Sequence, residues 1–386
     1  MKIITRNILI LSFISLFTDV ASEMLYPIMP IYLKTIGFSI ILIGVLEGFA
    51  EATAGLSKGY FGNLSDNKGK RLPFVQIGYA FSAISKPMMA LFAYPLWIFF
   101  SRTIDRLGKG VRTGARDALL SDEATPQTKG RVFGFHRSMD TLGAVIGPLA
   151  ALVYLAYHPN DYKTLFFIAF FPGITAIAIT FLIKERHKEQ PKPKSKTRLL
   201  DFVKYWKESP ATYRKLVGAL LVFTLFNSSD VFLLLKIKEA GFTDATVIGV
   251  YVFYNLIYAL FSYPLGILAD QIGMKKIFIA GLGLFATVYL GMAHAESKIV
   301  FIALFFLYGV YAAATEGIAK AWITNICKKE NTATAIGTYT AFQSIATLIA
   351  SSLAGLVWFS FGAAATFLIS GIVTIVVAIY IMRFKN

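Results

Sequence analysis

The sequence predicts an all-α membrane protein in which twelve transmembrane helices form two pseudo-symmetric bundles of six. The chain of 386 residues is 56% hydrophobic and only 16% charged, and its mean hydropathy of +0.62 is too apolar for a soluble domain. Long apolar runs recur along the chain, and a spanning helix needs about 20 residues. A polar turn between two such runs returns in the second half, which indicates two related halves.

The apolar runs end at Gly, Pro or clusters of charge and fall into two sets of six. The first set lies near residues 7–33, 39–63, 73–94, 95–118, 129–156 and 162–184, and the second near 212–236, 245–269, 275–294, 298–324, 331–357 and 361–383. We therefore predict an N-terminal six-helix bundle over residues 1–184 and a C-terminal six-helix bundle over residues 212–386.

A charged segment separates the two sets, and we assign residues 185–211 to a cytoplasmic linker. Its first part is rich in Lys and Pro, a composition typical of a solvated tether. Its second part alternates apolar residues, from Leu199 to Trp206, with Lys204, Lys207 and Glu208. That alternation predicts a short amphipathic helix at the membrane surface.

Basic residues mark one side of the membrane. They occur at the N-terminus, in the turns near Lys70, Lys275 and Lys328, and at the C-terminus near Arg383, whereas the alternate loops carry few. By the positive-inside rule, both termini are predicted to be cytoplasmic in a multi-pass protein of the cytoplasmic (inner) membrane. Orientation signals and contacts with anionic lipids account for the net charge of +16, so no nucleic-acid partner is expected.

The repeated turn runs from Gly59 to Arg71 and reads G-Y-F-G-N-L-S-D-N-K-G-K-R. It returns 204 residues later as P-L-G-I-L-A-D-Q-I-G-M-K-K. The matching positions are Gly62, Asp66, Gly69 and Arg71 in the first copy and Gly266, Asp270, Gly273 and Lys275 in the second. The turn resembles the loop between helices two and three of the major facilitator superfamily, whose pattern is roughly G-x-L-[SA]-D-x-x-G-[RK]-[RK].

A second segment, Gly143-Ala-Val-Ile-Gly147-Pro148, resembles the superfamily's fifth-helix motif G-x-x-x-G-P, which is associated with antiporters. Small residues at this spacing let two helices approach closely. The family motif continues with glycines where this chain has Ala150 and Ala151. The resemblance implies two bundles around a central cavity that opens alternately to each side of the membrane.

Ionisable residues lie at middle depths of the first five predicted helices, where each costs about 2.5 to 3.5 kcal/mol to insert. The acids are Asp19, Glu23, Glu47, Glu51, Asp105 and Asp140, and the bases are Lys86, Arg102, Arg106 and Arg137. If every base pairs with one acid, two acids remain, and a buried unpaired carboxylate takes up a proton rather than staying charged. These acids are therefore candidates for proton coupling, and the alternative is a static ion-pair network.

Two further sets of residues complete the prediction. Middle depths of the C-terminal half carry aromatic and amide side chains that suit an organic ligand, namely Tyr251, Tyr254, Asn255, Tyr258, Tyr339 and Gln343. Residues at the cytoplasmic ends form a predicted gate, namely Gly62, Asp66, Gly69, Arg71, Arg112, Arg116, Asp270, Glu316 and Lys320. In that gate we expect Asp66 to face the positive end of a neighbouring helix or an arginine such as Arg112. Asp230, toward the outer end, suits either an outer gate or a helix cap.

The leading hypothesis is a secondary transporter that exports a small organic molecule in exchange for protons. The alternative is uptake of an anionic metabolite or siderophore by proton symport, with Lys86, Arg102, Arg106 and Arg137 holding its carboxylates. A membrane enzyme or sensor is a remote third hypothesis, because H-E-x-x-H, G-x-S-x-G and phosphate-loop motifs are absent. We expect no metal and no cofactor, a proton gradient as energy source, and a monomer whose partners are substrate, protons and lipids.

Overall fold

The computed structural model describes residues 3–26, 28–185, 198, 200–227 and 230–384, and every regular element in these residues is a helix. The first half contains α1 (Arg6–Glu23), α2 (Met29–Thr35), α3 (Ile40–Lys68), α4 (Leu72–Leu91), α5 (Pro95–Asp122), α6 (Lys129–Tyr157) and α7 (Tyr162–Thr180). After the linker come α8 (Asp201–Glu208), α9 (Ala211–Phe226), α10 (Asp230–Glu239), α11 (Asp244–Ile272), α12 (Met274–Met292), α13 (Lys298–Ile326), the 3₁₀ turn η1 (Lys329–Asn331) and α14 (Thr332–Met382).

These helices match the twelve predicted spans. The first span is the interrupted pair α1 and α2, the seventh is the pair α9 and α10, and α14 contains the last two spans on either side of Gly362. Among the described residues, seven segments are long and apolar enough to cross a membrane on composition alone.

Glycine ends the helix in both copies of the repeated turn. Gly69 follows α3 with φ 62°, and Gly273 follows α11 with φ 104°. A residue with a side chain rarely adopts such angles, whereas glycine does so at little cost. The positive φ required directly after each helix therefore explains why both copies of the turn have glycine at this position.

The chain divides into two compact units. Unit 1 comprises Met1–Thr125, Met139–Ser209 and Cys327–Ser344, and unit 2 comprises Pro126–Ser138, Pro210–Ile326 and Ile345–Asn386. These units follow spatial contacts, so the start of α6 belongs to unit 2 and the start of α14 belongs to unit 1. The bounds predicted for the two bundles follow the sequence repeat instead, and they stay a prediction.

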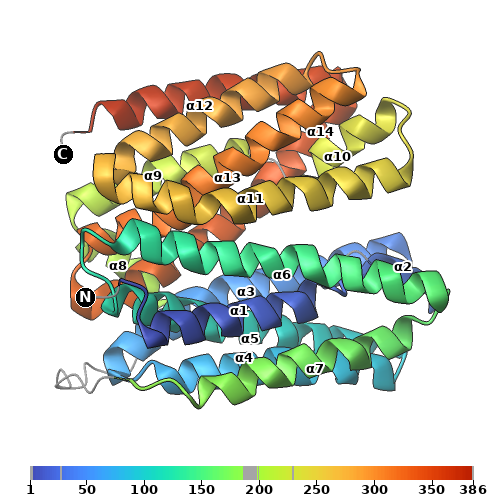
Figure 1. The fold of residues 1–386 in the computed structure, drawn as a ribbon, viewed down its shortest axis with the longest axis horizontal. Helices are drawn as coiled ribbons and strands as arrows, with labels where there is room; N and C mark the ends of the chain where they lie inside the picture. Colours follow the sequence, from blue (N-terminus) through green and yellow to red (C-terminus); the bar gives the residue numbers. More distant parts are fainter. Residues whose placement is uncertain (1–2, 27, 186–197, 199, 228–229, 385–386) are drawn as a thin grey trace. The chain divides into compact units, whose positions relative to one another are not determined.

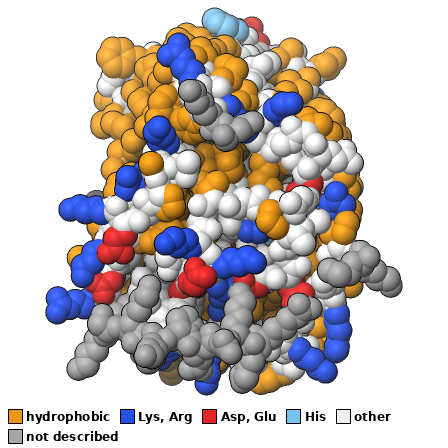
Figure 2. Space-filling view, turned by 90° about the vertical axis from the view of Figure 1, so that its left-hand side faces the viewer, with side chains coloured by type: hydrophobic (Ala, Val, Ile, Leu, Met, Phe, Trp, Pro, Cys, Tyr) orange, Lys and Arg blue, Asp and Glu red, His pale blue; other side chains and the backbone are white. Residues whose placement is uncertain are grey.

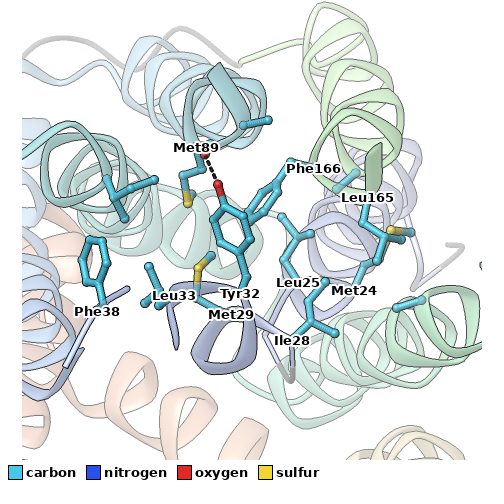
Figure 3. Packing of buried hydrophobic residues seen from close by; sticks show 14 of the residues in the cluster. Met24, Leu25, Ile28, Met29, Tyr32, Leu33, Phe38, Met89, Leu165 and Phe166 are labelled. Carbon is cyan, nitrogen blue, oxygen red and sulfur yellow. Dashed lines mark hydrogen bonds between the residues drawn. The ribbon is translucent and has the colours of Figure 1, made fainter. Parts of the chain in front are cut away.

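Within unit 1, α4 packs against α5 and α7, and α3 packs against α5 (Figure 1). A buried apolar cluster surrounds α2, where the Tyr32 ring lies 5.0 Å from the Phe166 ring and the Tyr32 hydroxyl donates to the Met89 carbonyl at 3.3 Å (Figure 3). Within unit 2, α13 packs against α11 and α12.

The amphipathic helix expected after the linker is confirmed as α8, although the linker residues 186–197 lie outside the described residues. Its Phe202 is buried, and a Cβ added at Gly59 of α3 would meet the Phe202 ring at 2.7 Å. The Thr338 hydroxyl of α14 donates to the Phe202 carbonyl at 3.2 Å. The apolar side of α8 therefore packs onto other helices of unit 1.

Candidate functional site

Charged side chains form clusters in the structure, both on the surface and in the interior. Figure 2 shows acidic and basic side chains close to one another over the lower part of one face, with hydrophobic side chains prominent above them. The buried charged groups lie deeper, and most of those in unit 1 come from α5. Contacts centred on Asp105, Arg106 and Asp140 involve the acids predicted to take part in proton coupling.

Asp105 of α5 is an acid already paired with bases. Lys86 Nζ lies 2.6 Å from Asp105 Oδ1, and Arg102 Nη1 lies 3.5 Å from Asp105 Oδ2. All three side chains are buried. Removing charged groups from water is compensated only by good pairing, and two bases around one acid supply it. Asp105 is therefore the least suitable of the six acids to exchange a proton.

The acids of α3 have a different setting. Arg106 Nη1 lies 3.3 Å from Glu51 Oε1, and the Glu51 side chain is 50% exposed. The side chain of Glu47, the other candidate on α3, lies outside the described part of the structure. Glu51 is therefore a paired, partly solvated acid, and the role predicted for Glu47 stays a prediction.

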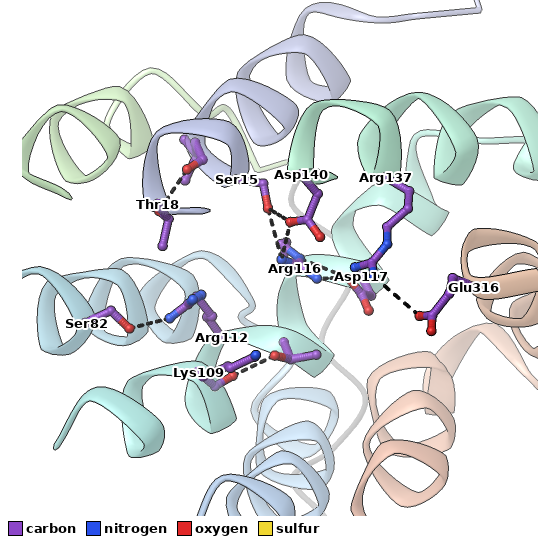
Figure 4. A network of polar contacts seen from close by, with 12 residues as sticks. Ser15, Thr18, Ser82, Lys109, Arg112, Arg116, Asp117, Arg137, Asp140 and Glu316 are labelled. Carbon is purple, nitrogen blue, oxygen red and sulfur yellow. Dashed lines mark hydrogen bonds and ion pairs between the residues drawn. The ribbon is translucent and has the colours of Figure 1, made fainter. Parts of the chain in front are cut away.

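Asp19 of α1 and Asp140 of α6 lie close together in unit 1, and their carboxyl groups interact electrostatically. Two negative charges side by side repel each other, so such a pair favours a proton on one of the two groups. The hydroxyl of Ser15 donates to Asp140 Oδ1 at 2.6 Å (Figure 4). Glu23, one turn from Asp19, adds a further negative charge nearby. Asp19 and Asp140 are thus candidate acids from different helices that the structure brings close together.

The fifth-helix motif makes this meeting possible. A Cβ added at Gly143 of α6 would meet the Leu16 carbonyl at 2.6 Å and the Asp19 Cβ at 2.8 Å. A Cβ added at Gly147 would meet the Val20 carbonyl at 2.7 Å. Close helix approach through small residues, as the motif predicts, is therefore confirmed, and it brings α1 against α6 next to the two acids.

Arg116 lies beside the acid pair. Its guanidinium contacts Asp117 Oδ1 at 2.9 Å and Ser15 Oγ at 3.1 Å, and its Nη1 lies 3.9 Å from Asp140 Oδ1 (Figure 4). Arg112 instead contacts the hydroxyl of Ser82 at 2.5 Å and lies over the Tyr79 ring. The structure thus places Arg116 in a position to compensate a charge on Asp140.

Asp66 in the repeated turn caps a helix. Its Oδ2 accepts from the backbone N–H of Thr334 at 2.7 Å and from the Thr334 hydroxyl at 2.9 Å, in the first turn of α14. Its Oδ1 lies 3.2 Å from Arg71, which also pairs with Asp122. The N–H groups of a first helical turn have no partners within the helix and carry partial positive charge. The expectation that Asp66 faces the positive end of a neighbouring helix is confirmed, and the alternative partner Arg112 is wrong.

The second copy repeats this arrangement within unit 2. Asp270 Oδ1 accepts from the backbone N–H of Gly130 at 2.7 Å, and Oδ2 accepts from that of Arg131 at 3.0 Å, at the start of α6. Gly130 and Thr334 are 204 positions apart, as are the two aspartates. Glycine allows the contact in each copy, because a Cβ at Gly62 or Gly266 would lie about 2.5 Å from a backbone carbonyl of the capped helix.

The remaining predicted residues fall into different places. Arg137 pairs with Glu316 at 3.5 Å and contacts the hydroxyl and ring of Tyr258, all in unit 2. The pairing of Arg137 with an acid of the first five helices therefore stays a prediction, and the partner that the structure shows is Glu316. Of the predicted ligand-binding set, Tyr251, Tyr254, Asn255 and Tyr258 lie on α11 in unit 2, whereas Tyr339 and Gln343 belong to unit 1. Lys320 is half-buried on α13, next to Glu316 along the helix.

Comparison with known proteins decides the family. The sequence model of the Major Facilitator Superfamily matches residues 11–255 and 216–385. The chain belongs to this superfamily. It is 32% identical to an uncharacterized MFS-type transporter of Methanocaldococcus jannaschii over 361 residues, which is 92% of this chain and 89% of the relative. It is 24% identical to the multidrug resistance protein MdtG of Dickeya zeae over 387 residues, which is 97% of this chain and 93% of that protein.

The fold agrees with that of solved superfamily members. The crystal structure of the human organic anion transporter MFSD10 matches with a TM-score of 0.83 at 15% identity, over 97% of this chain and 99% of that chain. The fold is thus the twelve-helix fold of the Major Facilitator Superfamily. The chain is an integral membrane transporter of small molecules and not an enzyme.

In this superfamily member, no sequence pattern groups Asp230 with tyrosines. The structure joins Asp230 of α10 to Tyr254 of α11 and Tyr308 of α13, and Tyr308 was in no predicted set. The repeat points to this region as a possible site, because both the first and the seventh span are interrupted at matching positions. Among the described residues, no group of three or more His, Cys, Asp or Glu could hold a metal ion.

Proposed function

We propose that this transporter exports a small organic solute across the cytoplasmic membrane in exchange for protons, as a monomer with both termini in the cytoplasm. The observation that carries the proposal is the close approach of α1 and α6 at Asp19 and Asp140, where a Cβ added at Gly143 of α6 would meet the Asp19 Cβ at 2.8 Å. Because two carboxylates side by side repel each other, the pair favours holding a proton while α1 and α6 are in contact. A site that holds a proton when sealed and releases it when wetted is what coupling to a proton gradient requires.

The surroundings of the pair suit such a cycle. When the proton leaves, Asp140 carries a negative charge 3.9 Å from Arg116 Nη1. Arg116 can then turn from Asp117 toward Asp140, and Ser15 contacts both groups in the meantime. The loss of one proton thus changes the pairing of an arginine, which converts proton release into a rearrangement of side chains.

The other charges favour export of an organic solute over uptake of an anion. Lys86, Arg102 and Arg106 each contact an acid, so they are poorly placed to hold the carboxylates of a substrate. Similarity to a multidrug resistance protein over nearly the whole chain also supports export. The aspartate caps at α14 and α6 offer contacts that would have to break and re-form as the transporter changes state.

Everted membrane vesicles with an acidic lumen, reported by a pH-sensitive dye, test the proposal. A panel of organic solutes is added, and a solute exchanged for protons dissipates the gradient. We expect Asp19→Asn and Asp140→Asn to abolish this response while the proteins still insert, whereas Asp161→Asn, in an extramembrane loop, keeps it. A response of normal size in both Asp19→Asn and Asp140→Asn vesicles would overturn the assignment of the proton site.

A further inference from the structure

Two transmembrane spans are interrupted at matching positions. The first breaks between the end of α1 at Glu23 and the start of α2 at Met29, and the seventh breaks between the end of α9 at Phe226 and the start of α10 at Asp230. The offset of the repeat places Asp230 opposite Tyr26 of the first break. Interrupted helices in corresponding halves of a transporter commonly line its ligand sites, because backbone and side-chain polar groups there escape the helical pattern.

The two breaks differ in chemistry. The first is filled by the protein's own apolar core, since Met24, Leu25 and Ile28 are buried in the cluster around Tyr32 (Figure 3). The second carries a carboxylate, Asp230, which is partly exposed. The break in unit 2 therefore presents, at the start of α10, a carboxylate that a ligand could reach.

Two tyrosines orient the Asp230 carboxylate. The hydroxyl of Tyr308 donates to Oδ1 at 2.6 Å, and the hydroxyl of Tyr254 donates to Oδ2 at 2.5 Å. Each carboxylate oxygen thus accepts one hydrogen bond and has capacity for another. In the described part of the structure, no Lys or Arg contacts this carboxylate. An acid at this depth without a cationic partner is costly, and a positively charged ligand would compensate it.

The walls around Asp230 are aromatic. The ring of Tyr254 lies 5.4 Å from those of both Tyr251 and Tyr308, and the rings of Tyr308 and Tyr311 are 5.3 Å apart. The faces of such rings attract organic cations. The rings also offer apolar surface to a hydrocarbon skeleton, which a bare inorganic ion does not use.

Asn227, at the end of α9, adds an acceptor. Its amide nitrogen donates to the Tyr311 hydroxyl at 3.1 Å, while its Oδ1 is buried and accepts no hydrogen bond among the described residues. Buried polar atoms nearly always have a partner, so an unused acceptor indicates a missing donor. An N–H group of a ligand would satisfy it.

We propose that Asn227, Asp230, Tyr254 and Tyr308 form a binding site for a protonated organic amine. The ammonium group donates N–H bonds to the Asp230 carboxylate and to Asn227 Oδ1, and the hydrocarbon part packs against the tyrosine rings. If the ligand were a proton, neither Asn227 nor the tyrosine rings would contribute to binding. If it were a sodium ion, the tyrosine rings would not contribute. This assignment names the substrate class of the proposed exporter and rests on that function.

Equilibrium dialysis of radiolabelled phenethylamine against the detergent-purified protein at pH 7 tests the site, because this amine is protonated at that pH. The neutral analogue 2-phenylethanol has the same ring and a similar length. We expect saturable binding that unlabelled phenethylamine displaces and 2-phenylethanol does not. Asp230→Asn should weaken binding at least about tenfold, since it removes the charge that pairs with the ammonium. Glu239→Gln, on the same helix, is the matched control and should bind normally.

Asn227→Leu gives a separate test of the donor geometry. It should weaken phenethylamine binding severalfold but leave binding of benzyltrimethylammonium unchanged, because the quaternary cation has no N–H to donate. Tyr308→Phe keeps the ring and loses one hydrogen bond to Asp230, so it should bind phenethylamine only a few-fold more weakly. This variant keeps the site testable if Asp230→Asn does not fold.

The proposal is overturned if Asp230→Asn binds phenethylamine normally, if 2-phenylethanol competes equally well, or if sodium at equal concentration displaces the amine. The binding assay uses no proton gradient, so it is independent of the Asp19 and Asp140 assignment. Asp19→Asn protein should therefore bind phenethylamine normally. Normal amine binding together with an intact proton response in Asp19→Asn and Asp140→Asn vesicles would refute the assignment of the proton site alone.

Discussion

Asp66 of α3 accepts hydrogen bonds from both the backbone N–H and the hydroxyl of Thr334, at 2.7 and 2.9 Å. Asp270 forms the corresponding contact with the backbone of Gly130 at 2.7 Å, so the sequence repeat is also a repeat of one interaction. Each aspartate lies near the end of one long helix and caps the start of another from the opposite half of the sequence. The repeated turn is thus a pair of helix caps as well as a sign of duplication.

Removal of one cap should destabilise the protein measurably. Asp66→Ala takes the acceptor from Thr334 and a negative charge from the positive end of α14, at a cost of about 0.5–2 kcal/mol. We expect a lower midpoint of thermal unfolding for Asp66→Ala and for Asp270→Ala, with nearly additive effects in the double variant. Glu208→Gln, at an exposed position of α8, serves as the control. Unchanged unfolding of both single variants would contradict the capping role.

A side chain at Gly143 should separate α1 from α6. The Cβ of Gly143→Ala would meet the Leu16 carbonyl at 2.6 Å, and overpacking of this kind costs about 1–3 kcal/mol. We expect Gly143→Ala to lower the unfolding midpoint and to reduce the proton response in vesicles. The matched control is Gly218→Ala in α9, where the added Cβ has nothing within 4 Å. That change should be neutral or stabilising because alanine favours the helix.

The Asp105 cluster should respond unequally to loss of its members. Asp105→Asn leaves Lys86 and Arg102 buried without their shared acid, whereas Lys86→Met leaves Asp105 paired with Arg102. Breaking a buried pair costs about 3–5 kcal/mol when a charge remains uncompensated. We therefore expect a larger fall in thermal stability and folded yield for Asp105→Asn than for Lys86→Met. Equal losses in the two variants would show that Arg102 does not stabilise Asp105.

Asp161, in the loop before α7, should make stability depend on pH in acid solution. Hydrogen bonds from the Tyr154 hydroxyl and from Thr164 hold the pKa of Asp161 below its usual value. A lowered pKa in the folded state stabilises the protein above the unfolded value of about 3.9, and the stabilisation is lost as the pH falls through the lower folded value. The difference in unfolding midpoint between wild type and Asp161→Asn should be constant near pH 7 and shrink below about pH 4. A constant difference down to pH 3 would contradict this.

The sequence alone determined the spans and their duplication. The predicted runs 39–63 and 245–269 correspond to α3 (Ile40–Lys68) and α11 (Asp244–Ile272), and the helices extend past the runs because a helix continues into polar residues at the membrane surface. Apolar periodicity and length are local properties, so they can be read from neighbouring residues. The sequence also predicted that Asp66 faces the positive end of a neighbouring helix or an arginine, and in the structure it contacts both Thr334 and Arg71.

Only the tertiary structure decided which charges meet. A count of acids and bases predicted surplus acids, but it could not pair Asp19 with Asp140, which are far apart in the sequence and meet through Gly143. It also could not pair Arg137 with Glu316, which lies on a span of the second half. Contacts of this kind depend on the rotation of each helix about its axis and on close packing between helices. Those quantities come from the whole fold and are absent from any single stretch of sequence.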